Sequence, residues 1–172
     1  MQRHLLGFAR RIFFGLALGL AVCGVAIALS LGWPAIVLAD AGADAIEITV
    51  YRDPGCRCCG GWMEHLRTQG FEPKNVPIED MEAFKREHGI SEELSSCHTA
   101  VLEGYLIEGH VPVADIQRLL VERPQIAGIA VPGMPIGTPG MEADDGTQDA
   151  FEVISFDGQG NSAVFSEYSP EG

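Results

Sequence analysis

The stretch IEITVYRDPGCRCCGGWMEHL, residues 46–66, joins two structural patterns at a group of cysteines. Residues 46–51 alternate between apolar and polar side chains and are rich in β-branched residues, which predicts a strand. The Asp-Pro-Gly sequence at 53–55 ends that strand, because these residue types are typical of turns. Residues 58–70 show apolar side chains on one helical face and end in glycine, which predicts a helix. Three cysteines therefore lie where a strand passes into a helix, and they are Cys56, Cys58 and Cys59.

The remainder of the chain continues this alternation of strands and helices. The predicted elements are an extended segment (71–78), a helix (79–89), a β-hairpin (98–110), a helix (111–124), a Gly/Pro-rich loop (127–146) and a second β-hairpin (151–168). Strands that alternate with helices predict an α/β layer fold. A C-x-x-C pair such as Cys56 and Cys59 at the first strand-helix junction is typical of a thioredoxin-like fold. We therefore expect a thioredoxin-like, three-layer α/β fold with an added C-terminal β-hairpin.

The first 41 residues have the features of an export signal. Three arginines precede an uncharged stretch at 12–38, and residues 39–41 form an A-x-A cleavage site. The uncharged stretch is also long enough to span a bilayer, so an uncleaved N-terminal anchor helix is the alternative. We expect a signal peptide or membrane anchor in residues 1–41 and an exported domain in residues 42–172. Contact with a membrane is expected only through residues 12–38, if they are retained.

The charge of the exported domain argues against polyanionic partners. Residues 1–41 hold three of the 11 basic residues and one of the 24 acidic residues, so residues 42–172 carry a net charge of −15. Such a charge repels nucleic acid and anionic lipid, and it favours solubility. A domain of about 130 residues can also build its own core without disulfide staples.

Four cysteines remain in this domain, namely Cys56, Cys58, Cys59 and Cys97. They fit a dithiol redox centre, a structural disulfide or a soft-metal site. The N-terminus of a helix stabilises thiolates, which are both the nucleophiles of disulfide exchange and the ligands of soft metals. A dithiol oxidoreductase needs only Cys56 and Cys59, so Cys58 would be surplus. Adjacent Cys58 and Cys59 cannot easily turn toward one zinc ion, whereas they can bridge two ions of a polynuclear Cu(I) cluster.

Further candidate residues accompany these cysteines. Cys97 precedes a predicted strand at the place where glutaredoxin-like folds carry a cis-proline facing the dithiol, so it is expected to direct a fourth sulfur at the other three. His98 is a candidate ligand or orienting partner, and a loop histidine satisfied by its neighbours is the alternative. Met134 and Met141 are candidates for a copper-contacting lid, with simple packing as the alternative. His110 is expected to cap or pack near the start of a helix.

Three stretches resemble a known family: VYRDPGCRCCGGWMEHLRTQGF (50–71), SCHTAVLEGYLIEGHVPVADIQRLL (96–120) and AVPGMPIGTPGME (130–142). They are similar to the CopG-type copper-resistance proteins of Gram-negative bacteria, which are also catalogued as domain of unknown function 411. The resemblance implies a thioredoxin-like fold, a copper cluster held by the cysteines, and a role in periplasmic copper handling that includes Cu(I)/Cu(II) interconversion. It matches all four cysteines of the exported domain and both methionines of the Gly/Pro-rich loop.

We therefore predict a periplasmic protein that sequesters Cu(I) in copper resistance. The predicted metal-site residues are Cys56, Cys58, Cys59, Cys97, His98, Met134 and Met141. The expected partners are copper ions and other periplasmic copper-handling proteins, and zinc is the less favoured metal. Whether the protein is an enzyme stays open. The main alternative is a periplasmic thiol-disulfide oxidoreductase that uses Cys56 and Cys59, followed by a stapled domain without a ligand.

Overall fold

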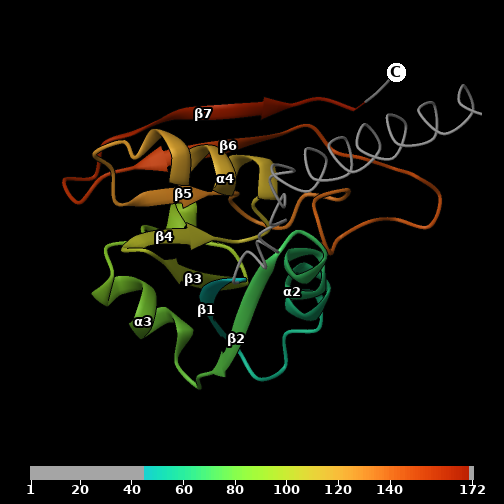
Figure 1. The fold of residues 1–172 in the computed structure, drawn as a ribbon, viewed down its shortest axis with the longest axis horizontal. Helices are drawn as coiled ribbons and strands as arrows, with labels where there is room; N and C mark the ends of the chain where they lie inside the picture. Colours follow the sequence, from blue (N-terminus) through green and yellow to red (C-terminus); the bar gives the residue numbers. More distant parts are fainter. Residues whose placement is uncertain (1–44, 171–172) are drawn as a thin grey trace, which may run out of the picture. The chain divides into compact units, whose positions relative to one another are not determined.

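The computed structural model describes residues 45–170 of the chain (Figure 1). The predicted signal peptide or anchor, including its A-x-A site, lies outside the described residues. Within residues 45–170, no helix has both the length and the apolar character needed to cross a membrane.

Seven strands and three α-helices alternate along the described residues. In chain order the elements are β1 (Ile46–Arg52), α2 (Cys58–Thr68), β2 (Phe71–Pro77), α3 (Met81–Glu87), the 3-10 helix η1 (Glu92–Leu94), β3 (His98–Leu102), β4 (Tyr105–Glu108), α4 (Val113–Glu122), β5 (Gly128–Ala130), β6 (Phe151–Phe156) and β7 (Ser162–Tyr168). The predicted α/β class is confirmed, and every predicted strand and helix is present with small shifts at its ends.

All seven strands form one mixed sheet in the order β2-β1-β3-β4-β5-β6-β7. Figure 1 shows β7 at one edge and β2 at the other. Strands β1 and β2 are parallel, and β3 runs antiparallel to β1. Strand β5 is parallel to β4 and antiparallel to β6, so it joins the C-terminal hairpin β6–β7 to the other strands. The hairpin therefore extends the same sheet.

The prediction of an unbroken loop over residues 127–146 was wrong at β5. This strand is only three residues long and begins with glycine, so it shows no strand pattern of its own. A Cβ on Gly128 would lie 2.1 Å from the carbonyl oxygen of Leu106, so only glycine fits beside β4 at this position. The remaining Gly/Pro loop, residues 131–150, connects β5 to β6.

Helices cover both faces of the sheet. Trp62 and Leu66 of α2 and Ile116 of α4 belong to one buried cluster, together with Ile48 of β1. On the opposite face the ring of Phe84 from α3 stacks on Tyr51 of β1, with ring centroids 4.5 Å apart. Alternate residues of a strand point to opposite faces, so α2 and α4 share one face while α3 packs on the other.

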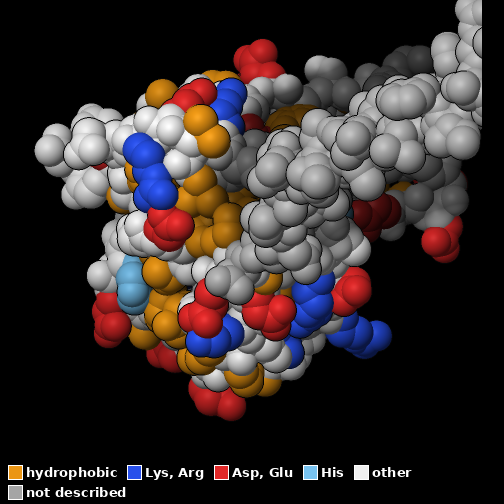
Figure 2. Space-filling view, viewed as in Figure 1, with side chains coloured by type: hydrophobic (Ala, Val, Ile, Leu, Met, Phe, Trp, Pro, Cys, Tyr) orange, Lys and Arg blue, Asp and Glu red, His pale blue; other side chains and the backbone are white. Residues whose placement is uncertain are grey.

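Acidic side chains are spread over the face of the domain that Figure 2 shows. Figure 2 shows Asp and Glu side chains over several elements of the face in view, with Lys and Arg side chains between them. The diffuse charge follows from the composition of the chain and does not by itself mark a binding site.

Candidate metal centre

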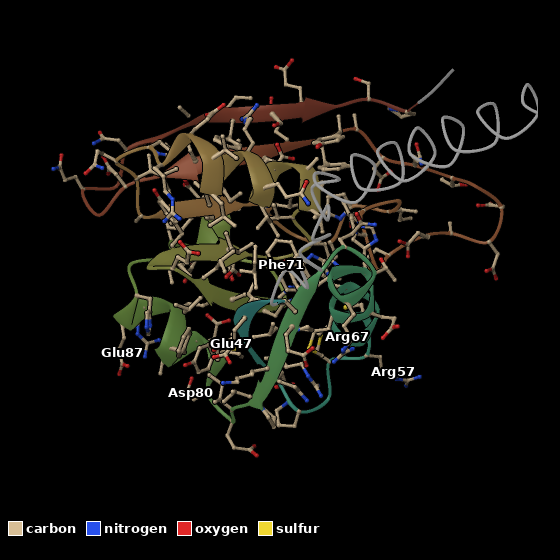
Figure 3. All side chains as sticks on the ribbon, viewed as in Figure 1. Glu47, Arg57, Arg67, Phe71, Asp80 and Glu87 are labelled. Carbon is tan, nitrogen blue, oxygen red and sulfur yellow. A yellow bond between two sulfur atoms is a disulfide. The ribbon has the colours of Figure 1, made fainter. Side chains whose placement is uncertain are left out.

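The turn between β1 and α2 places the C-x-C-C cysteines at the first turn of the helix. The side chain of Arg52, the last residue of β1, donates hydrogen bonds to the backbone carbonyls of residues 53, 54 and 56. The Asp53 carboxylate accepts a hydrogen bond from the backbone N–H of Gly55 at 2.7 Å, which closes the turn. Arg57 precedes α2 and points into solvent, as Figure 3 shows. Arg52 and Asp53 thus hold the backbone of the cysteine turn, in which Cys59 is buried while Cys56 and Cys58 are half-buried.

The structure brings together the four cysteines that the sequence pattern singled out. The sulfur of Cys58 lies 3.6 Å from that of Cys56 and 3.7 Å from that of Cys97. The sulfurs of Cys59 and Cys97 are also 3.7 Å apart. The four Sγ atoms all lie within 4.8 Å of one another, so they form one group that can hold a metal ion.

Two of these sulfurs are joined in the structure. Cys56 and Cys59 form a disulfide, visible as the yellow bond in Figure 3, while Cys58 and Cys97 are free. A disulfide sulfur is not a thiolate ligand, so all four sulfurs can act as ligands only after a two-electron reduction. The structure thus shows the site with two free thiols, and reduction of the disulfide would raise that number to four.

Cys97 links the helix turn to the start of β3. Burial raises the pKa of the Cys97 thiol to about 12, and the neighbouring Cys58 contributes through its charge and its hydrogen bond. In the metal-free protein Cys97 is therefore a protonated thiol at neutral pH. A soft cation that replaces this proton would release it into solution.

His110 is a site residue that the sequence reasoning assigned to helix packing. Its Nε2 lies 3.1 Å from the sulfur of Cys97, and its Nδ1 lies 2.8 Å from the carbonyl oxygen of Pro139. Because a carbonyl only accepts, the hydrogen-bond pattern assigns the ring proton to Nδ1 and leaves a lone pair on Nε2. Burial lowers the pKa of His110, which favours this neutral form.

The register of the predicted hairpin could have identified His110. Thr99 of β3 pairs with Glu108 of β4. In an antiparallel pair, the residue two positions before Thr99 therefore faces the residue two positions after Glu108. Those residues are Cys97 and His110, so a hairpin centred on the Glu103-Gly104 turn already implies their proximity.

His98 is fully buried beside the sulfur group. Its Nδ1 lies 3.2 Å from the sulfur of Cys97, and its ring packs on Trp62 with centroids 4.4 Å apart. Its Nε2 is buried and has no hydrogen-bond partner among the residues that the structure describes. Burial lowers the pKa of His98 well below its ordinary value, so its imidazole is neutral.

The two candidate methionines lie in different surroundings. Met134 is 54% exposed. It lines an open pocket of about 500 Å³ together with Cys56, Cys58 and Cys97. Met141 is in the same loop but is not among the residues that line this pocket. The structure thus brings Met134, and not Met141, to the opening above the cysteines.

A buried ion pair on the other face of the sheet holds the segment around Cys97. Lys85 Nζ lies 2.9 Å from a carboxylate oxygen of Glu108, and both side chains are almost fully buried. Glu108 accepts hydrogen bonds from the backbone N–H of Ser96 and the hydroxyl of Thr99, while Lys85 donates to the carbonyl of Ser96. Residues on both sides of Cys97 are therefore fixed. Sequence reasoning did not select Lys85 or Glu108.

Comparisons with known proteins agree with this geometry. Residues 94–141 match a family described as "Protein of unknown function, DUF411". Two solved structures, "Copper resistance protein copG- Form 1" and "Form 2", each share 44% sequence identity with this chain. Each match covers 72% of this chain and 98% of the other, with a TM-score of 0.68. No protein in the curated collection matches this chain.

The fold and the site define a mixed α/β domain whose clustered cysteines can bind a metal ion. Identity at this level over nearly the whole length of both solved structures establishes kinship beyond the fold. The chain belongs to the CopG-type copper-resistance family.

Proposed function

We propose that this protein sequesters Cu(I) through its cysteine thiolates in the periplasm and thereby contributes to copper resistance. The observation that carries the proposal is the group of four sulfurs within 4.8 Å of one another. Thiolates are the protein ligands that favour Cu(I), and the donor set here is dominated by sulfur. Membership of a family whose solved members are named copper resistance proteins supports the same conclusion.

We further propose that the site holds more than one copper ion. Cys97 belongs to two overlapping groups of potential ligands, one with the other three cysteines and one with His98 and His110. A thiolate can bridge two ions, so Cys97 would connect a sulfur-rich position to a position with nitrogen ligands. This arrangement favours a multinuclear thiolate cluster rather than a site for one four-coordinate zinc ion.

The Cys56–Cys59 disulfide gives this proposal a redox component. Two Cu(II) ions can take one electron each from the two reduced thiols. The products are two Cu(I) ions, the disulfide and two protons. Cys58 and Cys97 remain as thiols that can bind the Cu(I) produced. An external dithiol would restore the two thiols by disulfide exchange. Cu(I)/Cu(II) cycling is thus part of the proposed function.

The architecture supports a thioredoxin-like domain at residues 42–172. Strands β2, β1, β3 and β4 lie side by side, and α2 begins at the cysteines that follow β1. We propose that residues 1–41 export this domain as a signal peptide or retain it at the membrane as an anchor. Other periplasmic copper-handling proteins are the proposed partners.

A second candidate function is thiol-disulfide exchange through Cys56 and Cys59. The disulfide between them is the observation that favours it. Cys97 before β3 weighs against it, because glutaredoxin-like folds normally carry a proline at this position.

The experiment that tests the proposal is an anaerobic titration of the reduced full-length protein with Cu(I) against a chelator. We expect the wild type to bind more than one Cu(I) per chain and Cys58→Ser to bind fewer Cu(I) ions than the wild type. If Cys58→Ser keeps the copper stoichiometry but the protein reduces disulfide substrates, the second function is correct. One bound zinc with weak copper competition would instead establish a zinc site.

A further inference from the structure

A contact between two glycines holds the Gly/Pro loop against helix α2. A Cβ built on Gly61, in the first turns of α2, would lie 3.0 Å from the Cα of Gly140. A Cβ on Gly140 would lie 2.4 Å from the backbone nitrogen of Trp62. Gly140 also has a φ of +84°, which disfavours other residues. The backbones approach so closely that neither position accepts a side chain unless the loop moves.

This contact sets the position of the carbonyl group that orients His110. Pro139 directly precedes Gly140, and its carbonyl oxygen accepts the hydrogen bond from His110 Nδ1 at 2.8 Å. On the other side of the imidazole ring, Nε2 lies 3.1 Å from the sulfur of Cys97. A chain of direct contacts therefore runs from the backbone of α2 through the loop to the cysteine site.

A second contact ties the same helix to the residue after His110. The indole N–H of Trp62 donates a hydrogen bond of 3.0 Å to the carbonyl oxygen of Val111. The backbone around His110 and the loop that binds its ring thus both contact α2, the helix that carries Cys58 and Cys59. Relative movement between His110 and these cysteines is restricted by both contacts.

We propose that the Gly61–Gly140 contact and the Pro139 carbonyl are a positioning device that holds His110 as a nitrogen ligand beside the cysteine sulfurs. This inference rests on the proposed copper-binding function. A metal-ligating histidine usually donates its second ring N–H to a backbone carbonyl or carboxylate, which fixes the tautomer and the ring orientation. His110 has such a partner. His98 has none for its Nε2 among the described residues, so His110 is the better oriented of the two imidazoles.

Helix α2 offers a matched pair of variants to test the proposal. Gly60 and Gly61 are neighbours in the same helix, but a Cβ on Gly60 would meet no atom within 4 Å. We expect Gly61→Ala in the reduced full-length protein to weaken Cu(I) binding by about 10–100-fold, the usual effect of losing an orienting partner. Gly60→Ala should bind as the wild type does. Equal affinities in two folded variants would overturn the proposal.

The loop provides a second pair with the same backbone conformation. Gly140 and Gly146 both have positive φ, +84° and +76°, but a Cβ on Gly146 would meet no atom within 4 Å. Gly140→Ala should therefore weaken Cu(I) binding while Gly146→Ala does not. Similar losses in both variants would mean that backbone strain, and not the contact with α2, is responsible.

The tautomer of His110 in the metal-free protein gives a readout that does not depend on copper. We expect ¹⁵N NMR to show a protonated Nδ1 and an unprotonated Nε2 for His110 in the wild type, and a mixture of tautomers in Gly61→Ala. A proton on Nε2 in the wild type would overturn the inference even if neither alanine variant folds.

If the protein binds no Cu(I), the proposed function fails, whatever the tautomer of His110. If it binds Cu(I) but the His110 tautomer is not the expected one, only this inference fails.

Discussion

The sulfur of Cys97 lies 3.1 Å from Nε2 of His110, although the two residues are 13 positions apart in the chain. The β3–β4 hairpin brings them together, because its register pairs Thr99 with Glu108 just inside them. Cys97 also completes the four-sulfur group with Cys56, which precedes α2, and with Cys58 and Cys59 of α2. One side chain thus belongs to a sulfur-rich group and to a group with two imidazoles.

The redox state of the C-x-x-C pair should determine how much copper the protein binds. With the Cys56–Cys59 disulfide intact, only Cys58 and Cys97 offer thiols, so we expect fewer Cu(I) ions per chain than after reduction. Alkylation of the unfolded protein followed by mass spectrometry should find two free thiols in the described domain before reduction and four afterwards. Equal copper stoichiometry in the two states would contradict this prediction.

The two methionines of the Gly/Pro loop should differ in their effect on copper binding. Met134 lines the pocket above the cysteines, whereas Met141 does not, so Met134→Leu should weaken Cu(I) binding several-fold and Met141→Leu should not. The reason is that a thioether is a soft ligand, which leucine replaces with a side chain of similar size. Chelator competition on the two variants measures this difference, and a larger effect at Met141 would show that the lid is arranged differently.

Loss of Lys85 should destabilise the fold around Cys97. Lys85→Met leaves the Glu108 carboxylate buried without its cation, so we expect the free energy of unfolding to fall by about 3–5 kcal/mol near neutral pH. Burial already raises the pKa of Glu108, and Lys85 opposes that rise. Without Lys85 the pKa of Glu108 in the folded protein rises further. The variant should therefore regain stability as the pH falls through this pKa, because Glu108 then binds a proton and loses its charge.

Urea unfolding at about pH 7 and about pH 5 measures this recovery. Adding Glu108→Gln to Lys85→Met removes the buried charge and serves as the control. The free energy of unfolding of the double variant should depend less on pH than that of Lys85→Met. Equal losses at both pH values in the single variant would be inconsistent with an uncompensated Glu108 charge.

The attachment of the C-terminal hairpin to α4 should weaken in alkali. The Tyr168 hydroxyl donates to Asp115 at 2.6 Å, and burial together with this hydrogen bond raises the pKa of Tyr168 above its ordinary value. A raised folded pKa means that the stabilisation is complete below the unfolded pKa of about 10 and is lost as the pH rises above it. As the pH rises above about 10, the midpoint temperature of thermal unfolding should therefore fall more steeply for the wild type than for Tyr168→Phe. Parallel curves for the two proteins would argue against a stabilising Tyr168–Asp115 hydrogen bond.

The parts of the fold that could be predicted from the sequence are those with strong local patterns. Strand β1, the turn at 53–55 and α2 follow from alternation, turn residues and helical spacing, and they place three cysteines at a helix N-terminus. Strand β5 could not be predicted in this way, because its three residues are specified by the close approach of Gly128 to Leu106 on β4.

The site was predictable where chain neighbours or hairpin register determine it. The cysteine spacing indicated a sulfur site, and the hairpin register contained the information needed to add His110. The C-x-x-C spacing also indicated Cys56 and Cys59 as the pair of a dithiol, and these are the two cysteines that the structure joins. The spacing alone did not decide between a disulfide and a metal site. The Lys85–Glu108 pair joins α3 to β4 across the sheet face, and no local pattern connects these two residues.

The central claim is that Cys97 is shared between two groups of copper ligands, and native mass spectrometry of the reduced full-length protein loaded with Cu(I) tests it most directly. We expect more than one Cu(I) per wild-type chain and a larger loss of bound Cu(I) for Cys97→Ser than for any other single cysteine replacement. An unchanged copper count in folded Cys97→Ser would contradict it.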